Sequence, residues 1–329
     1  MDVEDTPAQK RAQSSAATGA GRSDALRQLA QMLQDTGYRF TTVTPATHAR
    51  VNSRPGNAWA ARIEDVFGWS RPFRAGLLPA EMFRLLQEAG ALVPHGEGWR
   101  SLIRVSSLQD RLFIHSAFPT SAGDAVFFGP DTYRFLSALD THLALREAPV
   151  VRAVDIGCGA GPGAIMIALR QPRAEVLAVD INDTALGYTA INASLAGVAN
   201  VTARHGDLLS GIEGKFDLIV ANPPYLLDAS ARTYRHGGGT LGEGLSVAII
   251  RQALQRLTPG GSLLLYTGVA IVDGHDRFRS MAQALLAEAH ADWDYREIDP
   301  DVFGEELEEP AYGTADRIAA VVLQVTLRG

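Results

Sequence analysis

The chain contains a single cysteine, only two lysines and no long apolar run. One cysteine, Cys158, allows neither an intramolecular disulfide nor a zinc site built from several cysteines, and it fits a reducing compartment. The longest uncharged stretch, from Thr184 to Ala203, is interrupted by asparagine and glycine, whereas a membrane span needs about 20 mainly apolar residues. The N-terminal residues lack the apolar core of a signal peptide. We therefore expect a soluble, cytoplasmic protein.

No overall excess of basic residues marks the chain as a nucleic-acid binder, and its net charge is −7. Up to Val150 there are 16 Lys and Arg against 15 Asp and Glu, and from Val151 onward there are 14 against 22. A local basic patch would still suffice for binding. The best candidate for such a patch is a set of six arginines: Arg39, Arg50, Arg54, Arg62, Arg71 and Arg74. An ordinary solvated surface is the alternative interpretation.

The composition is that of a globular protein with two domains. Apolar residues make up 46% and charged residues 20% of the chain, which excludes global disorder. At about 100–200 residues per domain, a length of 329 residues favours two domains. We predict a disordered tail over residues 1–23, a small α+β domain over 24–118 and an α/β domain over 119–329.

The segment 24–118 has the pattern of a few helices followed by two strands. The expected elements are helices at 23–37, 58–67 and 79–90 and strands at 102–105 and 111–115. Ser23 is a good N-cap, and Gly37 and Gly90 are typical helix ends. A helix followed by a hairpin is the outline of a winged helix, although any small α+β domain could give it. We expect this domain to be an accessory domain that recognises a substrate or serves packing alone.

From Val150 onward, short apolar strands alternate with helices. Strands are expected at 150–156, 175–179, 201–203, 216–221 and 262–266, and helices at 164–169, 184–196, 247–257 and 277–288. This βαβ rhythm predicts a parallel sheet with helices on both faces, which is a Rossmann-like doubly wound fold. Two further strands, Asp294–Ile298 and Ile318–Leu327, predict an antiparallel hairpin at one edge of the sheet.

Acidic side chains and glycines follow the first three of these strands. The first strand runs into Asp155 and a glycine loop that contains Gly157, Cys158, Gly159 and Gly161. Glycines at such a strand-to-helix turn let the backbone approach a ligand closely, and Asp155 can order the turn or face a cation. The next strand ends in Asp180, followed by Ile181, and an acid at that place can accept hydrogen bonds from a ribose diol. Asp207 and Leu208 follow the third strand and could bind an adenine ring. Ordinary helix capping is the alternative for these acids.

The most specific motif is Asn222-Pro223-Pro224-Tyr225, which directly follows a buried strand. The prolines stiffen the turn and remove backbone donors. The Asn222 side-chain oxygen and the Pro223 carbonyl can then accept two hydrogen bonds from one planar NH2 group. Tyr225 is expected to offer an aromatic face on which a planar amide or base stacks.

With these motifs, residues 119–329 resemble class I S-adenosylmethionine-dependent methyltransferases of the group with an Asn-Pro-Pro-Tyr (NPPY) motif. That group includes release-factor glutamine methyltransferases and the adenine-N6 and guanine-N2 methyltransferases of nucleic acids. The resemblance implies S-adenosyl-L-methionine as cofactor, no metal, and a catalytic role for the four residues from Asn222 to Tyr225. The cofactor-binding residues that it implies are Asp155, Gly157, Cys158, Gly159, Gly161, Asp180, Ile181, Asp207, Leu208 and Asn222. The segment Phe128–Thr132 is similar in place to one that covers the cofactor in this group.

Several functions compete at this point. A protein glutamine side chain, for example in a translation factor, is the favoured methyl acceptor, and an amine of rRNA, tRNA or DNA is the alternative. A dehydrogenase would match the glycine loop but leaves the NPPY motif unexplained. An esterase would need a Gly-x-Ser-x-Gly elbow, which the chain lacks. A non-catalytic binding module would predict a broken cofactor set. The segment 24–118 and the loop Tyr234–Gly239 do not match the group.

Overall fold

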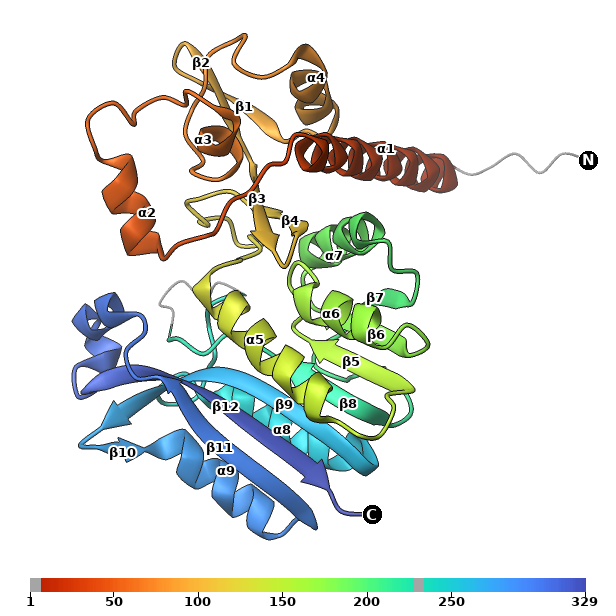
Figure 1. Cartoon of the computed structure of the whole chain (residues 1–329), viewed down its shortest axis with the longest axis vertical. Coiled ribbons are helices and arrows are strands. Elements are labelled where there is room, and N and C mark those ends of the chain that lie inside the picture. The colour runs from red at the N-terminus through yellow and green to blue at the C-terminus, as the bar shows by residue number, and fades with distance from the viewer. Residues whose placement is uncertain (1–6, 228–233) are drawn as a thin grey trace, which may run out of the picture. The chain divides into compact units, whose positions relative to one another are not determined.

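A computed structural model of the chain describes residues 7–227 and 234–329, which form two compact units (Figure 1). Unit 1 comprises the residues up to Thr120 together with Ser194–Gly197, and unit 2 comprises the rest. None of the helices described is long and apolar enough to cross a membrane.

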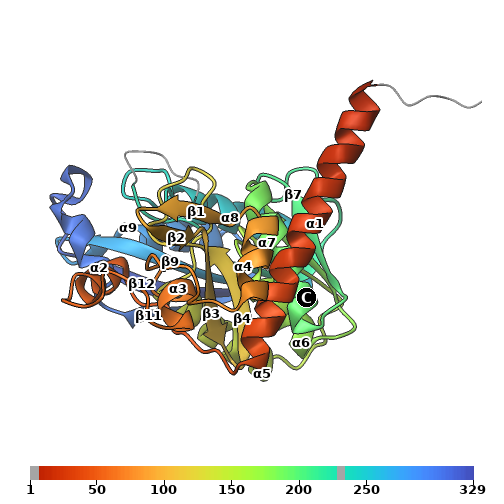
Figure 2. The same cartoon turned by 90° about the horizontal axis from the view of Figure 1, so that it is seen from above.

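Unit 1 combines helices with two separate two-stranded antiparallel sheets. Its helices are α1 (Pro7–Asp35), α2 (Pro45–Asn52), α3 (Ile63–Phe67) and α4 (Ala80–Glu88), and its strands are β1 (Leu92–His95), β2 (Gly98–Ser101), β3 (Ile103–Leu108) and β4 (Arg111–Ser116). Helix α1 is continuous and packs against α4 (Figure 2). Leu29 and Leu33 of α1 and Met82 and Leu86 of α4 are buried in the core of this unit.

The structure of unit 1 differs from the sequence-based expectation in three places. Helix α1 begins at Pro7, well before Ser23, because the Ala- and Gln-rich sequence between them consists mainly of strong helix formers. The predicted tail at 1–23 is therefore helical from residue 7, and its first six residues lie outside the described part of the chain. Helix α2 and the hairpin β1–β2 are additional elements, and the hairpin was hidden by its short strands, one of which contains Pro94.

Unit 2 has the predicted doubly wound architecture. Its helices are α5 (Pro130–Leu145), α6 (Pro162–Arg170), α7 (Asp183–Ala196), α8 (Gly244–Arg256) and α9 (Arg277–Ala287), with 3₁₀ turns η1 (Gly304–Glu308) and η2 (Pro310–Tyr312). Its strands are β5 (Arg152–Ile156), β6 (Glu175–Asp180), β7 (Val201–His205), β8 (Phe216–Ala221), β9 (Leu257–Val272), β10 (His275–Asp276), β11 (Ala291–Asp299) and β12 (Arg317–Leu327).

The main sheet of unit 2 has the strand order β11-β12-β9-β8-β5-β6-β7. The five strands from β9 to β7 are parallel, whereas β12 pairs antiparallel with both β9 and β11. This confirms the predicted antiparallel hairpin at the edge. Helices α5 and α6 pack together on one face of the sheet, and α8 crosses behind it (Figure 1). Residues such as Ile250 and Phe278 from α8 and α9 join the apolar core beneath the strands.

The order of the strands places a topological switch point between β5 and β8. The chain proceeds from β5 to β6 and β7 on one side and then returns to β8 on the other side. In open α/β sheets, ligands bind at the carboxyl ends of the strands beside such a switch point. The glycine loop follows β5 and the NPPY motif follows β8, so the fold brings the two motifs to that place.

Candidate active site

The glycine loop after β5 is shaped to approach a ligand. Gly157, Gly159 and Gly161 have φ angles of +69°, +55° and +82°, which residues other than glycine rarely adopt. A Cβ atom added to Gly157 would meet no atom within 4 Å, so there is open space above this residue. A Cβ on Gly161 would lie 2.8 Å from the Thr189 side chain. Gly161 therefore permits packing against α7, whereas Gly157 leaves room for a ligand.

Asp155 stabilises this loop by a hydrogen bond to the backbone of the following helix. Its Oδ2 atom accepts a hydrogen bond of 2.9 Å from the backbone N–H of Ala164, in the first turn of α6. The residue is only 2% exposed, and burial raises the pKa of Asp155 to about 7, with a further contribution from the charge of Asp180. The structure thus gives Asp155 the turn-ordering role, while direct contact with a ligand cation stays a prediction.

The ends of β6 and β7 form the other side of the expected cofactor site. Asp180 accepts hydrogen bonds of 2.9 Å from the backbone N–H groups of Gly159 and Asn182, which fix its carboxylate beside the loop. Burial raises the pKa of Asp180, although these amides oppose the rise. Ile181 is 49% exposed, which is unusual for a large apolar side chain. Asp207 is also exposed, and the neighbouring Leu208 has a left-handed φ of +53°.

Cys158 is an inert part of the loop. It is buried, and its Sγ atom lies 3.5 Å from the hydroxyl of Thr189. Burial raises the pKa of the Cys158 thiol well above its ordinary value, so the thiol stays protonated. Protonated, buried thiols are poor nucleophiles. Among the described residues, no group of His, Cys, Asp and Glu side chains could hold a metal ion.

The NPPY motif begins at the carboxyl end of β8, immediately after Ala221. Asn222 and Pro224 are half-buried and Pro223 is buried. The Asn222 side chain forms no hydrogen bond with any residue that the structure describes. An amide that bonds to none of the described residues, at the end of a central strand, is a candidate for binding a ligand group.

Tyr225 differs from the expectation. It is only 7% exposed, so its ring does not offer the open face predicted for stacking. The ring packs over Gly268 of β9, where an added Cβ would lie 2.2 Å from the ring, and its edge meets Phe303 at a centroid distance of 5.9 Å. Its hydroxyl donates a hydrogen bond of 2.5 Å to Asp131. Tyr225 therefore anchors the motif to the core, and the stacking prediction is wrong for this conformation.

The loop Tyr234–Gly239, which sequence reasoning left without a role, packs directly on the NPPY motif. Leu226 donates a backbone hydrogen bond of 3.1 Å to Arg235, and Gly237 donates one of 2.8 Å to Leu226. A Cβ on Gly237 would lie 2.7 Å from the Pro224 carbonyl oxygen. The signal in the sequence was the run of glycines, which marks a close approach of two backbones but does not show what is approached.

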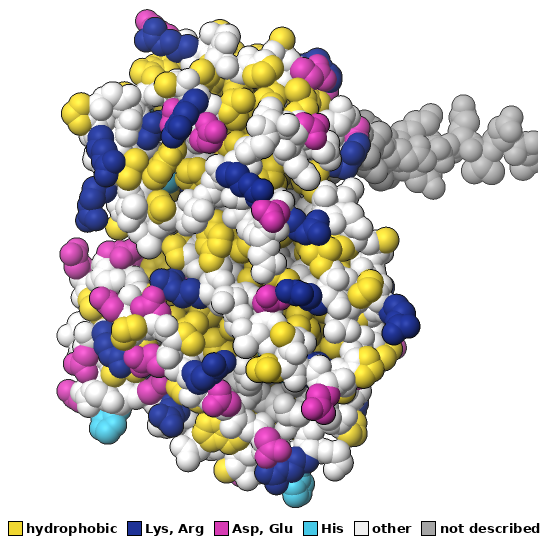
Figure 3. All heavy atoms as spheres, viewed as in Figure 1, with side chains coloured by type: hydrophobic (Ala, Val, Ile, Leu, Met, Phe, Trp, Pro, Cys, Tyr) yellow, Lys and Arg dark blue, Asp and Glu magenta, His cyan; other side chains and the backbone are white. Residues whose placement is uncertain are grey.

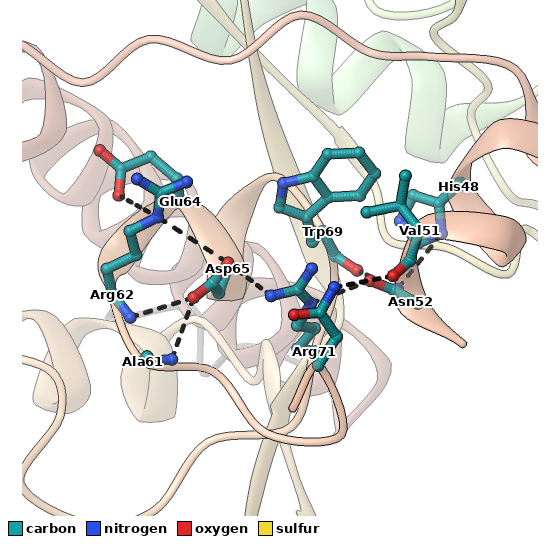
Figure 4. A network of polar contacts seen from close by, with 10 residues as sticks. His48, Val51, Asn52, Ala61, Arg62, Glu64, Asp65, Trp69 and Arg71 are labelled. Carbon is teal, nitrogen blue, oxygen red and sulfur yellow. Dashed lines mark hydrogen bonds and ion pairs between the residues drawn. The ribbon is translucent and has the colours of Figure 1, made fainter. Parts of the chain in front are cut away.

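The six arginines of unit 1 do not form one free basic patch. Arg71 is buried and donates a hydrogen bond of 2.8 Å to Asp65 of α3 and one of 2.9 Å to Asn52 of α2, so it ties α2 to α3 and to the segment after α3 (Figure 4). Ion pairs with acidic side chains also engage Arg39, Arg62 and Arg74. Of these six arginines, only Arg50 and Arg54 form no ion pair with an acidic side chain of the described residues. Basic side chains lie along the edge of unit 1 where Figure 1 places α2 (Figure 3).

Comparisons with known proteins agree with this geometry. Residues 132–271 match the family model described as the methyltransferase small domain. The release factor glutamine methyltransferase of Deinococcus radiodurans is 42% identical over 137 residues, which cover 38% of this chain and 49% of that protein. The corresponding protein of Koribacter versatilis is 32% identical over 188 residues, covering 53% of this chain and 62% of that protein.

The chain spans about half the length of the first of these relatives. The match to a solved structure, that of the tRNA m1G37 methyltransferase of M. jannaschii, covers 69% of this chain and 57% of that protein, with a TM-score of 0.48 and 14% sequence identity. The family model covers the strands β5 to β9 and hence both the glycine loop and the NPPY motif. Residues 132–271 thus match the methyltransferase small domain, and this part of the chain is similar to release-factor glutamine methyltransferases.

Proposed function

We propose that this chain transfers a methyl group from S-adenosylmethionine to the side-chain amide nitrogen of a protein glutamine. The observation that carries the proposal is the Asn222 side-chain amide, which follows β8 next to β5 and its open glycine loop and forms no hydrogen bond with a described residue. This arrangement supports the proposal that the Asn222 Oδ1 atom and the Pro223 carbonyl oxygen offer two acceptors for a planar nitrogen beside the position expected for the cofactor.

The residues around the glycine loop fit S-adenosylmethionine. The open space above Gly157 suits the close approach of a bound molecule to the backbone. Asp180 would accept hydrogen bonds from the ribose hydroxyls, and Asp207 one from the adenine amino group. The exposed Ile181 and the half-buried Leu208 would cover the apolar faces of the adenine ring. Each of these assignments uses a group that the structure leaves accessible or fixes in place.

The chemistry of transfer asks for positioning more than for acid–base catalysis. S-adenosylmethionine supplies an activated methyl group. An amide nitrogen is a weak nucleophile because its lone pair is delocalised. The Asn222 Oδ1 atom and the Pro223 carbonyl oxygen would each accept a hydrogen bond from one N–H group of the substrate amide. These hydrogen bonds strengthen as the nitrogen gains positive charge. The amide nitrogen would form the new N–CH3 bond as the S–CH3 bond of S-adenosylmethionine breaks, with S-adenosylhomocysteine as the leaving group, and the nitrogen would then release one proton to water.

The relatives favour a protein acceptor over a nucleic acid. The two reported above are named for glutamine methylation of a release factor, and a third, from Neisseria gonorrhoeae, is named for glutamine methylation of ribosomal protein uL3. Arg71, which belonged to the candidate nucleic-acid patch, is instead part of a buried ion pair. An adenine or guanine amine therefore has less support than a glutamine amide.

We also propose that residues 24–118 recognise the macromolecular acceptor, as an accessory domain to the methyltransferase domain at 119–329. The support is that unit 1 is compact and has an apolar core of its own. Its exposed surface also carries Arg50 and Arg54, which no acidic side chain of the described residues neutralises.

The test uses labelled cofactor with purified release factor, with ribosomal proteins and with RNA. We expect label in protein, at a glutamine identified by mass spectrometry, and none in RNA. Asn222→Ala should lower the rate of methyl transfer by about 10²–10³-fold, which is typical for the loss of one preorganised polar group at a reacting centre. Asn200→Ala is the control for the loss of an asparagine away from the site, since Asn200 precedes β7 at the opposite end of the sheet. Melting temperatures are compared as well, because the Asn200 amide donates hydrogen bonds of 3.2 and 2.9 Å to the carbonyls of Gln171 and Ala174. Transfer to RNA alone, or normal transfer by a folded Asn222→Ala protein, would refute the proposal.

A further inference from the structure

A buried acidic residue links two segments that flank the candidate site. Asp131 lies in the first turn of α5 and is only 4% exposed. Its Oδ2 atom accepts a hydrogen bond of 2.5 Å from the hydroxyl of Tyr225, and its Oδ1 atom accepts one of 2.6 Å from the hydroxyl of Tyr266. Arg134, one turn further along α5, lies 3.1 Å from the same carboxylate.

The buried carboxylate of Asp131 is stabilised by three specific side chains. Burial of a carboxylate is unfavourable unless hydrogen bonds or opposite charges compensate it. Asp131 obtains this compensation from two phenols and one guanidinium, which come from β9, from α5 itself and from the NPPY motif. Arg134 is in turn held by Asp299 at 2.7 Å.

A stiff stretch of backbone connects Tyr225, which is bonded to Asp131, with Asn222. Only Pro223 and Pro224 separate the two residues, and each proline ring fixes a backbone φ angle. The ring of Tyr225 is also confined by Gly268, because the space of the missing side chain is filled by the aromatic ring. A shift of the Tyr225 hydroxyl would therefore be carried along the turn to the Asn222 amide.

We propose that Asp131 is a positioning residue for methyl transfer, which holds the Tyr225 hydroxyl and thereby fixes the Asn222 amide and the Pro223 carbonyl at the site. This inference rests on the proposed function for its kinetic consequences. It also assigns a role to the segment Phe128–Thr132, whose Asp131 side chain reaches the NPPY motif directly.

The chain offers a matched pair of variants. Tyr225→Phe removes the phenol that joins Asp131 to the NPPY motif, and Tyr266→Phe removes the phenol that joins the same carboxylate to β9. Both residues are buried and each loses one hydroxyl group. A role limited to stability predicts similar effects for the two variants, whereas positioning predicts a difference in turnover.

The experiment measures kcat, cofactor affinity, melting temperature and hydrogen–deuterium exchange at the Leu226 amide for wild type, both phenylalanine variants, Asp131→Asn and Asp131→Ala. We expect Tyr225→Phe and Asp131→Ala to lower kcat by about 10–100-fold, since small misplacements at a reacting centre cost on this scale. Cofactor affinity should stay within about threefold in Tyr225→Phe, because the glycine loop, Asp180 and Asp207, which we propose to bind the cofactor, follow β5, β6 and β7. Amide exchange at Leu226 should become faster in the same two variants and not in Tyr266→Phe.

The double variant Asp131→Ala/Tyr225→Phe should lose no more activity than the worse single variant, because both act through one hydrogen bond. Asp131→Asn keeps the shape and should retain a larger share of kcat than Asp131→Ala. Equal kcat and Leu226 exchange in Tyr225→Phe and Tyr266→Phe would overturn the inference, as would additive losses in the double variant. If the wild type methylates no glutamine, the proposed function fails, while the exchange measurements still decide whether Asp131 holds the turn.

Discussion

The pH dependence of stability should reveal the buried carboxyl group of Asp155. Burial raises the pKa of this group from 3.8 to about 7 in the folded chain. Below a pH of about 4 the group is protonated in both the folded and the unfolded state, so it adds no pH dependence. Between about pH 4 and pH 7 the folded state keeps a proton that the unfolded state has released. The free energy of unfolding therefore falls as the pH rises through this range, and the loss is complete above pH 7.

The magnitude follows from the size of the shift. A difference of about 3 pKa units corresponds to about 4 kcal/mol, at 1.36 kcal/mol per unit, as an order of magnitude. Asp155→Asn keeps a side-chain oxygen that can accept the Ala164 N–H and removes the charge. Urea unfolding at pH 5 and pH 8 should show that the variant loses less stability than wild type over this interval. Asp180 repels the charged form of Asp155, and Asp155→Asn removes this repulsion too, which changes the comparison in the same direction. Equal losses in the two proteins would refute the reasoning.

Three further predictions test other parts of the chain. Asp180→Ala should weaken S-adenosylmethionine binding in calorimetry by about 1.5–3 kcal/mol, the typical cost of charged hydrogen bonds, and tight binding of NAD instead would contradict the assignment. Cys158→Ala should keep most of the methyl transfer activity, and the folded wild type should resist alkylation at this buried thiol. Asp65→Ala leaves the buried Arg71 without its counter-ion and should destabilise the chain by about 3–5 kcal/mol in thermal unfolding, whereas Glu64→Ala at a more exposed carboxylate should have little effect.

The fold of unit 2 could be predicted because its signals are local. Each central strand is a short apolar run, such as Phe216–Ala221, and each is separated from the next by a helical segment or a turn. The right-handed βαβ rule then leaves few possible arrangements. The elements of unit 1 that the sequence did not predict are short. The strands β1 and β2 have four residues each, and α2 is a helix of eight residues among arginines and prolines.

The candidate site was predictable where a residue acts through its place on a strand end. Asp180 is the last residue of β6, and Asn222 directly follows β8. Their position at the carboxyl ends of the strands therefore follows from the strand assignment. The environment of Tyr225 did not follow in the same way. Its ring lies over Gly268, and its hydroxyl is bonded to Asp131, which is 94 residues away in the sequence. An aromatic residue in a motif can be exposed or buried, and only the tertiary contacts decide which.

The glycines after the NPPY motif show why such contacts stay hidden in the sequence. Gly242 has a φ of +96°, and a Cβ atom at this position would lie 1.9 Å from the Tyr225 carbonyl oxygen. No side chain could occupy this position without moving the motif. Periodicity predicts which residues share a face of one helix or one strand, but this contact joins two irregular segments. The glycine run therefore indicated a constraint on the backbone, and the structure shows that the constraint is the NPPY turn itself. The turn is then held by the backbone of this loop as well as by the Asp131 carboxylate, so its geometry depends on residues outside the motif.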